Sequence, residues 1–184
     1  HSFMKKTYPN HAMRWSEVKR PIVCLAPMDG VTNSAYRQIV RSLNKEVFLF
    51  SEFTSVDGLF QNKFLSSRMY YNSCEHPFFM QLFGNSPEKF AEVSKMVEDR
   101  GIWGVDINMG CPSKKIVHSQ HGSALMKDTD TACRIIESIR SACKLEVSVK
   151  TRLGWTDHKN LIDFAKSLES SGASMLTIHG RTYN

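Results

Sequence analysis

The feature that most constrains the fold is a regular alternation of short apolar runs with segments of helical periodicity. The apolar runs cover residues 22–28, 47–53, 78–83, 104–109, 146–151 and 175–179. Most are almost continuously apolar, as parallel strands buried on both faces are. The helical stripes between them are Tyr36, Ile39, Val40 and Leu43; Phe90, Val93, Met96 and Val97; Ala132, Ile135, Ile136 and Ile139; and Leu161, Phe164, Ala165 and Leu168. This alternation predicts an α/β fold with a parallel sheet.

Local signals mark the ends of two of these helices. Ser86 can cap the second helix, and Pro87 suits its first turn because proline has no backbone N–H to leave unpaired. Gly172 is suited to end the last helix, since glycine readily adopts the left-handed conformation. The polar and aromatic stretch 66–74 shows neither the alternation of a strand nor the apolar stripe of a helix, and we expect loop and short helix there.

A polar or reactive residue stands at or near the end of each apolar run. These residues are Met28, Glu52, Gln81, Asn108, Lys150 and His179. A doubly wound sheet binds its ligand at one switch point. A (β/α)8 barrel instead collects functional groups from the C-terminal ends of many strands. Six strand ends that carry such residues therefore favour the TIM barrel.

A closed barrel of this type has eight strands, and the sequence contains six apolar runs. We therefore expect an incomplete barrel, in which residues 21–184 are the N-terminal part of the catalytic domain. Residues 1–20 are expected to be a tail, and residues 1–3, before Met4, resemble a remnant of cloning. The open first and last strands predict that residues 1–184 alone aggregate, stay partly unfolded or associate edge to edge.

Composition narrows the classes of protein that remain. Lys and Arg total 24 against 18 Asp and Glu, and this net charge of +6 favours an anionic partner. Hydrophobic residues at 41% exclude an intrinsically disordered chain. The longest apolar run falls far short of the roughly 20 residues of a membrane helix. Five cysteines without a C-x-x-C pair support neither a disulfide framework nor a metal site, and fit reduced thiols in the cytoplasm.

The most specific segment is 106–115, Asp-Ile-Asn-Met-Gly-Cys-Pro-Ser-Lys-Lys. A strand ends in Asn108, the chain turns at Gly110, and Cys111 follows on a loop that Pro112 stiffens. A cysteine thiol is mostly protonated at neutral pH, so on a loop above a barrel mouth it can donate a proton as well as attack. The simpler interpretation is that Cys111 is a buried structural cysteine. The adjoining Gly, Pro and Asn argue against that interpretation.

Three other strand ends carry weaker signals. Lys150 presents a positive charge that suits an anionic intermediate or a reduced cofactor, or else extends to solvent. His179 occupies the matching place on the last run, where a lone histidine is more often a hydrogen-bonded structural residue. The turn at 26–32 lets the backbone approach a flat ring closely. No G-x-G-x-x-G, P-loop or H-E-x-x-H motif is present, which argues against a Rossmann dehydrogenase or a nucleotide kinase.

Five motifs together resemble the tRNA-dihydrouridine synthases, and the bacterial branches most. They are residues 26–32, 106–115, 122–126, 149–155 and 178–182. The resemblance extends from Ile22 to the last residue. It implies an FMN-binding (β/α)8 barrel followed by a small helical RNA-binding domain. The family's flavin phosphate site lies after the seventh and eighth strands, so we expect residues 1–184 alone not to hold FMN stoichiometrically.

The resemblance also implies roles for individual residues. Those implied to bind the flavin are Pro27, Met28, Asp29, Gln81, Asn108, Lys150 and His179. Within this set, the first three form the turn against the flavin ring, and Lys150 meets the pyrimidine edge. Cys111 is implied as the proton donor, and Asn108 also faces the substrate. Our own candidates for contacts with RNA are Lys114, Lys115, Arg152 and Arg181.

The implied reaction reduces the C5–C6 double bond of a uridine in tRNA. NADPH reduces FMN, the reduced flavin gives hydride to C6, and Cys111 protonates C5. One alternative is a flavin barrel that acts on a free pyrimidine, because dihydroorotate and dihydropyrimidine dehydrogenases have a similar Asn-x-x-Cys-Pro loop. Lys127, the pair at 114–115 and the basic balance favour RNA instead. Another alternative is an inactive RNA-binding fragment.

Overall fold

The computed structural model describes residues 14–61, 67–113 and 121–184. The principal strands are β1 (Cys24–Leu25), β2 (Phe48–Phe50), β4 (Phe78–Phe83), β5 (Gly104–Met109), β6 (Glu146–Arg152) and β7 (Met175–His179). They pair in parallel in the order β1-β2-β4-β5-β6-β7. A further two-residue strand, β3 (Thr54–Ser55), pairs with the end of β4. Each predicted apolar run contains a strand, so the predicted parallel sheet is confirmed.

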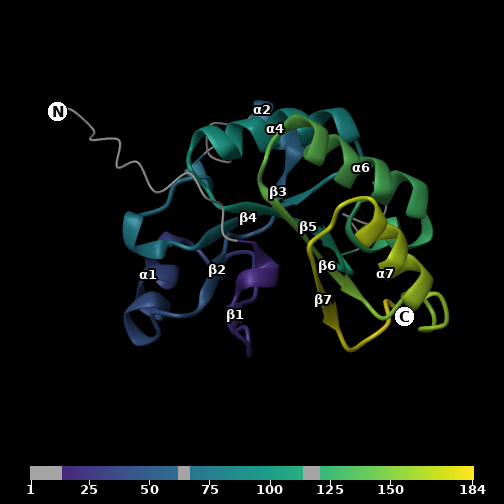
Figure 1. Cartoon of the computed structure of the whole chain (residues 1–184), viewed down its shortest axis with the longest axis horizontal. Coiled ribbons are helices and arrows are strands. Elements are labelled where there is room, and N and C mark those ends of the chain that lie inside the picture. Colours follow the sequence, from purple (N-terminus) through teal and green to yellow (C-terminus); the bar gives the residue numbers. More distant parts are fainter. Residues whose placement is uncertain (1–13, 62–66, 114–120) are drawn as a thin grey trace.

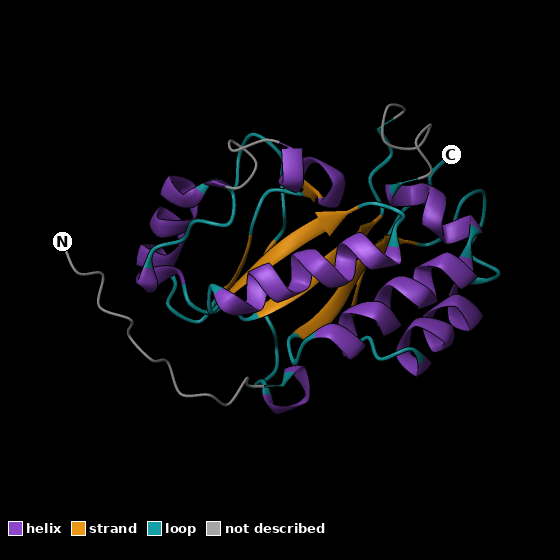
Figure 2. Ribbon diagram, turned by 90° about the horizontal axis from the view of Figure 1, so that it is seen from above, coloured by secondary structure: helices purple, strands orange, loops and turns teal. Residues whose placement is uncertain are grey.

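The sheet curls beneath a layer of helices (Figure 1). The described α-helices are α1 (Ser34–Leu43), α2 (Val56–Gln61), α4 (Pro87–Asp99), α6 (Thr129–Ala142) and α7 (Leu161–Ser170). Figure 2 shows α4, α6 and α7 along the outer face of the sheet. The order of the principal strands follows the chain from one edge to the other, whereas a doubly wound sheet reverses its order. The fold is therefore six strands of an incomplete (β/α)8 barrel.

The predicted helix ends are found at both marked positions. The Ser86 side chain accepts a hydrogen bond from the backbone N–H of Lys89 at 3.3 Å, and Pro87 is the first residue of α4. Gly172 follows α7 with a φ of +109°, and its N–H donates to the carbonyl of Glu169 at 2.9 Å. Within the stretch 66–74, the 3-10 helix η2 (Ser73–Glu75) begins at Ser73, while residue 66 lies outside the described residues.

Three described helices have no counterpart in the sequence prediction. They are α2 and the 3-10 helices η1 (Trp15–Glu17) and η3 (Gly122–Lys127). Each is six residues or shorter, which is less than two turns of an α-helix. A periodic apolar stripe cannot become visible over so short a length.

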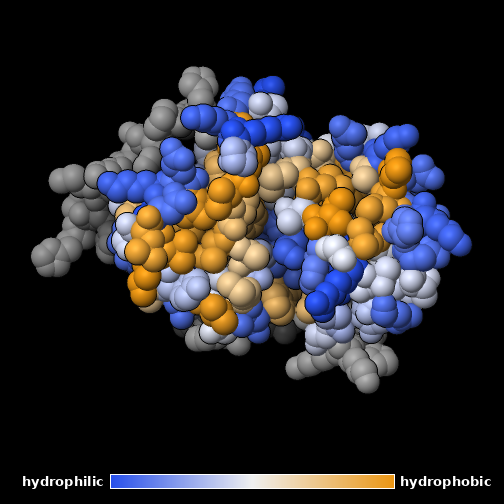
Figure 3. Space-filling model, turned by 90° about the horizontal axis from the view of Figure 1, so that it is seen from below, coloured by the Kyte–Doolittle hydropathy of each residue, from blue (hydrophilic) through white to orange (hydrophobic). Residues whose placement is uncertain are grey.

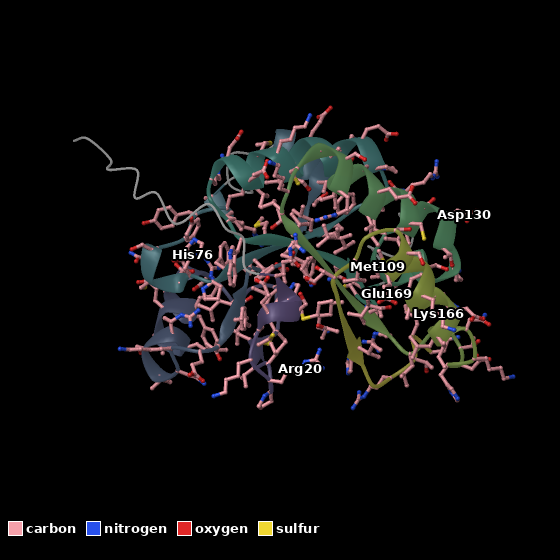
Figure 4. All side chains as sticks on the ribbon, in the orientation of Figure 1. Arg20, His76, Met109, Asp130, Lys166 and Glu169 are labelled. Atoms are coloured by element: carbon pink, nitrogen blue, oxygen red, sulfur yellow. The ribbon has the colours of Figure 1, made fainter. Side chains whose placement is uncertain are left out.

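The main core lies between the sheet and the helices. Val105, Ile107 and Met109 alternate along β5 and are completely buried, because every second side chain of a strand points to the same face. They pack with the apolar stripes of the helices, including Phe90 of α4 and Ile135 of α6. Figure 4 shows Asp130 and Lys166 at the outer edge of the helical layer, so the helices keep their polar faces toward solvent.

A second core fills the inner side of the curled sheet. Trp15, Phe48, Phe50 and Phe79 form this aromatic cluster, and the Trp15 ring lies 4.7 Å from Phe79 and 4.9 Å from Phe48 between centroids. Trp15 belongs to the stretch 1–20, yet its side chain is buried. Since Phe48 and Phe79 lie in the first half of their strands, the cluster fills the N-terminal end of the barrel. Space for a ligand is left at the C-terminal end.

Strands β1 and β7 form the two edges of the sheet within the described residues. Apolar side chains at these edges are exposed, with Val23 at 51% and Ile178 at 44%. Figure 3, which views the molecule from the side toward which β1 and β7 extend, shows apolar surface there. Association through these edges stays a prediction. No helix among the described residues is long and apolar enough to cross a membrane.

Candidate active site

A cavity of about 190 Å³ lies at the C-terminal ends of the strands. Its lining includes every residue that the sequence predicts for the flavin and for proton donation: Pro27, Met28, Asp29, Gln81, Asn108, Lys150, His179 and Cys111. Gly110, Pro112, Arg152 and Phe53 also line it. The fold thus gathers residues from six separate strand ends around one space, while the role of each residue stays a prediction.

Strand register explains why these side chains meet. Asn108 of β5 pairs with Lys150 of β6, and Arg152 of β6 pairs with His179 of β7. One level deeper in the barrel, Gln81 pairs with Asp106, which pairs with Ser148. Paired residues of neighbouring parallel strands point to the same face of the sheet. Two polar layers are therefore stacked on the inner side, and the cavity is lined by the outer layer together with Gln81 of the deeper layer.

The deeper layer is a buried hydrogen-bonded cluster. Gln81 Nε2 and Ser148 Oγ each donate to the Asp106 carboxylate at 2.6 Å. Asn108 Nδ2 donates to Gln81 Oε1 at 3.1 Å, which joins this cluster to the cavity wall. All four side chains are buried, and buried polar groups must be paired in this way because unpaired ones are costly.

Burial raises the pKa of Asp106 to about 6, although Ser148, Gln81 and the positive charge of Lys150 act in the opposite direction. In the unfolded chain an aspartate has a pKa of about 4. Between these values the folded protein holds a proton that the unfolded chain releases. The free energy of unfolding therefore falls as pH rises from about 4 to about 6, by a total on the order of 3 kcal/mol from this group.

Asp106→Asn removes this titration and should gain stability, relative to the unchanged protein, as pH rises. We expect the difference in unfolding free energy between the two proteins to grow between pH 4 and pH 6.5, measured by urea denaturation. Glu92→Gln, an exposed change on α4, is the control. If the two proteins differed in unfolding free energy by the same amount at pH 4 and at pH 6.5, the raised pKa of Asp106 would be contradicted.

The turn after β1 is held by two residues to which the sequence assigns no role. The N–H of Gly30, whose φ is +73°, donates to Glu52 Oε1 at 2.7 Å. Arg68 Nη1 lies 3.0 Å from Asp29 Oδ1, and Nη2 lies 3.7 Å from Glu52 Oε1. Asp29 therefore lines the cavity with its carboxylate already paired. The position of Glu52 at the end of an apolar run could have marked it as a site residue. Arg68 lies in a loop that carries no motif, so nothing in the sequence marks it.

Two side chains at the mouth are available for chemistry. Among the described residues, nothing accepts a hydrogen bond from the Lys150 ammonium or forms an ion pair with it, and the side chain is only partly exposed. The Cys111 thiol is also partly exposed, and its backbone N–H donates to Asn108 Oδ1 at 2.9 Å. The cavity thus combines a fixed positive charge with a thiol that can give up a proton.

His179 completes the mouth on the β7 side. Loss of solvent, together with the positive charges of Arg152, Lys150 and Arg181, lowers the pKa of His179 below its usual value. The imidazole is therefore neutral at pH 7 and keeps one nitrogen as a donor and one as an acceptor.

The predicted RNA contacts have different outcomes. Lys114 and Lys115 lie outside the described residues. Arg152 binds backbone instead of projecting freely, because its guanidinium donates to the carbonyls of Gly110 at 2.7 Å and Thr182 at 2.9 Å. It therefore ties the Cys111 loop to the segment after β7. Arg181 is exposed and remains a candidate. The described residues contain no group of three His, Cys, Asp or Glu side chains that could hold a metal ion.

Comparison with known proteins identifies the family. The profile of the dihydrouridine synthase family matches residues 24–184. The chain belongs to the dihydrouridine synthase family. The match begins at β1 and runs through β7, so all strands around the cavity lie within the family's domain.

Similar proteins carry the same family name. The chain is 37% identical over 161 residues to a probable tRNA-dihydrouridine synthase 1 from Synechocystis sp., which covers 87% of this chain and 45% of that protein. It is 39% identical over 162 residues to a probable tRNA-dihydrouridine synthase from Rickettsia conorii, covering 87% and 49%. A probable tRNA-dihydrouridine synthase from Staphylococcus aureus is 34% identical over 171 residues, covering 91% and 52%. The chain spans about half the length of these curated relatives.

Proposed function

We propose that this chain supplies contacts to the flavin ring and the proton donor of a tRNA-dihydrouridine synthase, which uses FMN and NADPH to reduce the C5–C6 double bond of uridines in tRNA. The observation that carries the proposal is that Lys150, whose ammonium has no partner among the described residues, and Cys111 line the same cavity. Membership of the dihydrouridine synthase family supports it. The proposed substrate also implies a location in the cytoplasm.

The lining of the cavity fits one end of a flavin. An isoalloxazine ring has an apolar edge and an opposite edge rich in hydrogen-bond acceptors and donors. The cavity offers apolar surface from Pro27, Met28 and Phe53, and polar groups from Asn108 and Lys150. The unpaired ammonium supplies the donor and positive charge that a reduced flavin needs. When bound, FMN supplies the electrons, taken from NADPH, that saturate the C5–C6 bond.

The chain's own residues position the base and move the proton. A uridine must leave the base stack before its ring can enter the mouth. Cys111 then transfers the proton from its Sγ to C5, as a general acid, while C6 receives the hydride. Asn108 orients the Cys111 loop through its bonds to the backbone N–H groups of Gly110 and Cys111. The thiolate that remains must regain a proton from solvent before the next turnover.

An assay of product formation tests the proposal. The protein, supplied with FMN, NADPH and tRNA that lacks dihydrouridine, should form dihydrouridine detectable by mass spectrometry of the nucleosides. Free uracil and orotate should be neither reduced nor effective competitors. Reduction of a free pyrimidine in place of tRNA would favour the dehydrogenase alternative. A colourless protein that binds tRNA without product would support the inactive RNA-binding fragment.

Binding of tRNA should weaken steeply as salt rises, because lysine and arginine displace counterions from phosphates. We expect Lys114→Ala with Lys115→Ala to reduce the slope of log affinity against log salt by about 1.5, if each lysine meets one phosphate. Filter binding over a salt series measures this slope. Reduction of FMN by NADPH should not change.

The control for this experiment is Lys45→Ala with Lys144→Ala. Both lysines are exposed and lie just before strands β2 and β6, at the end of the barrel opposite the mouth. This pair removes the same charge and should leave the slope nearly unchanged. Equal slopes for the two double variants would place the RNA surface away from Lys114 and Lys115.

A further inference from the structure

A directional chain of hydrogen bonds connects the buried Asp106 to the loop that carries Cys111. Gln81 Nε2 donates to Asp106 Oδ2 at 2.6 Å, and Asn108 Nδ2 donates to Gln81 Oε1 at 3.1 Å. Asn108 Oδ1 then accepts from the backbone N–H groups of Gly110 at 3.1 Å and Cys111 at 2.9 Å. Each group thus donates to the next in one direction: the loop N–H groups donate to Asn108, Asn108 to Gln81, and Gln81 to the Asp106 carboxylate.

The groups at the two ends of this series of hydrogen bonds fix the direction of donation. An ionised carboxylate can only accept hydrogen bonds, whereas a backbone N–H can only donate. The amide of Gln81 must therefore turn its nitrogen toward Asp106, and its oxygen is left for Asn108. Asn108 must turn its own nitrogen toward Gln81, which leaves its oxygen for the loop. Neither amide can flip without placing two donors or two acceptors face to face.

Burial makes this orientation costly to break. The exposed fractions of Gln81, Asp106 and Asn108 are 0%, 1% and 8%, so water cannot replace a lost partner. If Asp106 no longer accepted, Gln81 Nε2 would lie unpaired inside the protein, and the amide would rotate toward another acceptor. Its oxygen would then leave Asn108, and the restraint on the Cys111 loop would weaken.

We propose that Asp106 is a positioning residue for Cys111, because its carboxylate sets the orientation of Gln81 and Asn108 and thereby holds the loop that carries the thiol. Its effect on turnover rests on the proposed function, in which Cys111 is the proton donor. Its effect on the loop does not depend on that function. Asp106 lies below the cavity wall and does not line the cavity itself, so it acts through its neighbours.

Three variants separate the parts of this proposal. In Asp106→Leu the leucine side chain has a shape similar to that of aspartate but cannot accept a hydrogen bond. The series of hydrogen bonds from Gln81 to the Cys111 loop then lacks the acceptor that orients it. Asp106→Asn can turn its oxygen to Gln81 and its nitrogen to Ser148, so it keeps the orientation of both amides. Ser148→Ala is the matched control, since it removes the other hydrogen bond to the same carboxylate at 2.6 Å and leaves Gln81 in place.

The first measurement is the rate at which iodoacetamide alkylates each cysteine of the folded protein, resolved by peptide mass spectrometry. Cys74 is exposed on η2 and serves as the internal reference. In Asp106→Leu we expect the ratio of Cys111 to Cys74 alkylation to rise severalfold, because the loop loses its contacts with Asn108 and is held, among the described residues, only through the carbonyls of Gly110 and Cys111, which accept from Arg152 and Ser123. Asp106→Asn and Ser148→Ala should keep the ratio of the unchanged protein.

The second measurement is steady-state formation of dihydrouridine. A displacement of about 1 Å in a reacting group can cost about 10²-fold in rate. We therefore expect Asp106→Leu to lower kcat on the order of 10- to 100-fold, with little change in KM for tRNA. Asp106→Asn should restore most of this loss. A purely structural role would lower the amount of folded protein and would not separate kcat from KM.

The outcomes are distinct. An unchanged alkylation ratio and an unchanged kcat in Asp106→Leu would overturn the proposal. An Asp106→Asn variant as impaired as Asp106→Leu would also overturn it, because charge and not orientation would then matter. If the unchanged protein forms no dihydrouridine, the proposed function fails, and the alkylation ratio alone decides the role of Asp106. If Asp106→Leu does not fold, Gln81→Met cuts the same chain one link later and should raise the same ratio.

Discussion

Replacing Cys111 with alanine should leave FMN binding and reduction of FMN by NADPH intact, while dihydrouridine formation falls by roughly 10²-fold or more. This is the usual scale for losing a general acid. The thiol lines the cavity and the loop around it is held by backbone bonds to Asn108, so the smaller side chain should not disturb the fold. Single-turnover reaction of prereduced enzyme with tRNA isolates the affected step from reduction by NADPH.

Cys74→Ala is the matched control for this prediction. Cys74 is exposed outside the cavity, and its replacement should leave the single-turnover rate unchanged. Cys143 is buried against the main core, so its replacement can cost stability without touching the chemistry. A near-normal rate of product formation by Cys111→Ala would refute the assignment of the thiol as the proton donor.

The sheet could be predicted because its information is local. Runs such as 78–83 and 104–109 are almost continuously apolar, and the helices between them show a full apolar stripe. Burial on both faces of a parallel strand requires that pattern. The inner aromatic cluster was not predictable in the same way. Trp15 stands in a polar stretch without a period, and only the folded barrel brings it against Phe48 and Phe79.

The candidate site divides along the same line. The residues at strand ends could be gathered from the sequence, since parallel strands bring their C-terminal ends to one edge. The supporting contacts could not, because they depend on register across strands. Asp106 interrupts an apolar strand two residues before Asn108. Because side chains two residues apart in a strand point to the same face, this spacing could have indicated that both lie on the inner side of the sheet. Which amide faces which oxygen follows only from the folded geometry.

The buried pair of Arg37 and Glu75 should be the most sensitive point for stability outside the site. Arg37 Nε lies 2.5 Å from Glu75 Oε2, and the two side chains are 2% and 0% exposed. Arg37 also donates to the carbonyls of Thr32 at 2.7 Å and Tyr70 at 3.2 Å. Arg37→Ala leaves the Glu75 carboxylate buried without its counter-charge, and we expect a loss of about 3–5 kcal/mol in the free energy of unfolding.

The exposed ion pair of Lys89 and Asp57 provides the control. Their side chains are 45% and 34% exposed, and Lys89→Ala should cost less than about 1 kcal/mol. The double variant Arg37→Met with Glu75→Leu should recover much of the loss caused by Arg37→Ala, since it removes both charges instead of leaving one buried. Urea denaturation of all four proteins measures these differences. A loss for Arg37→Ala as small as that for Lys89→Ala would show that solvent reaches Glu75 and that the turn containing Thr32 is held by other contacts.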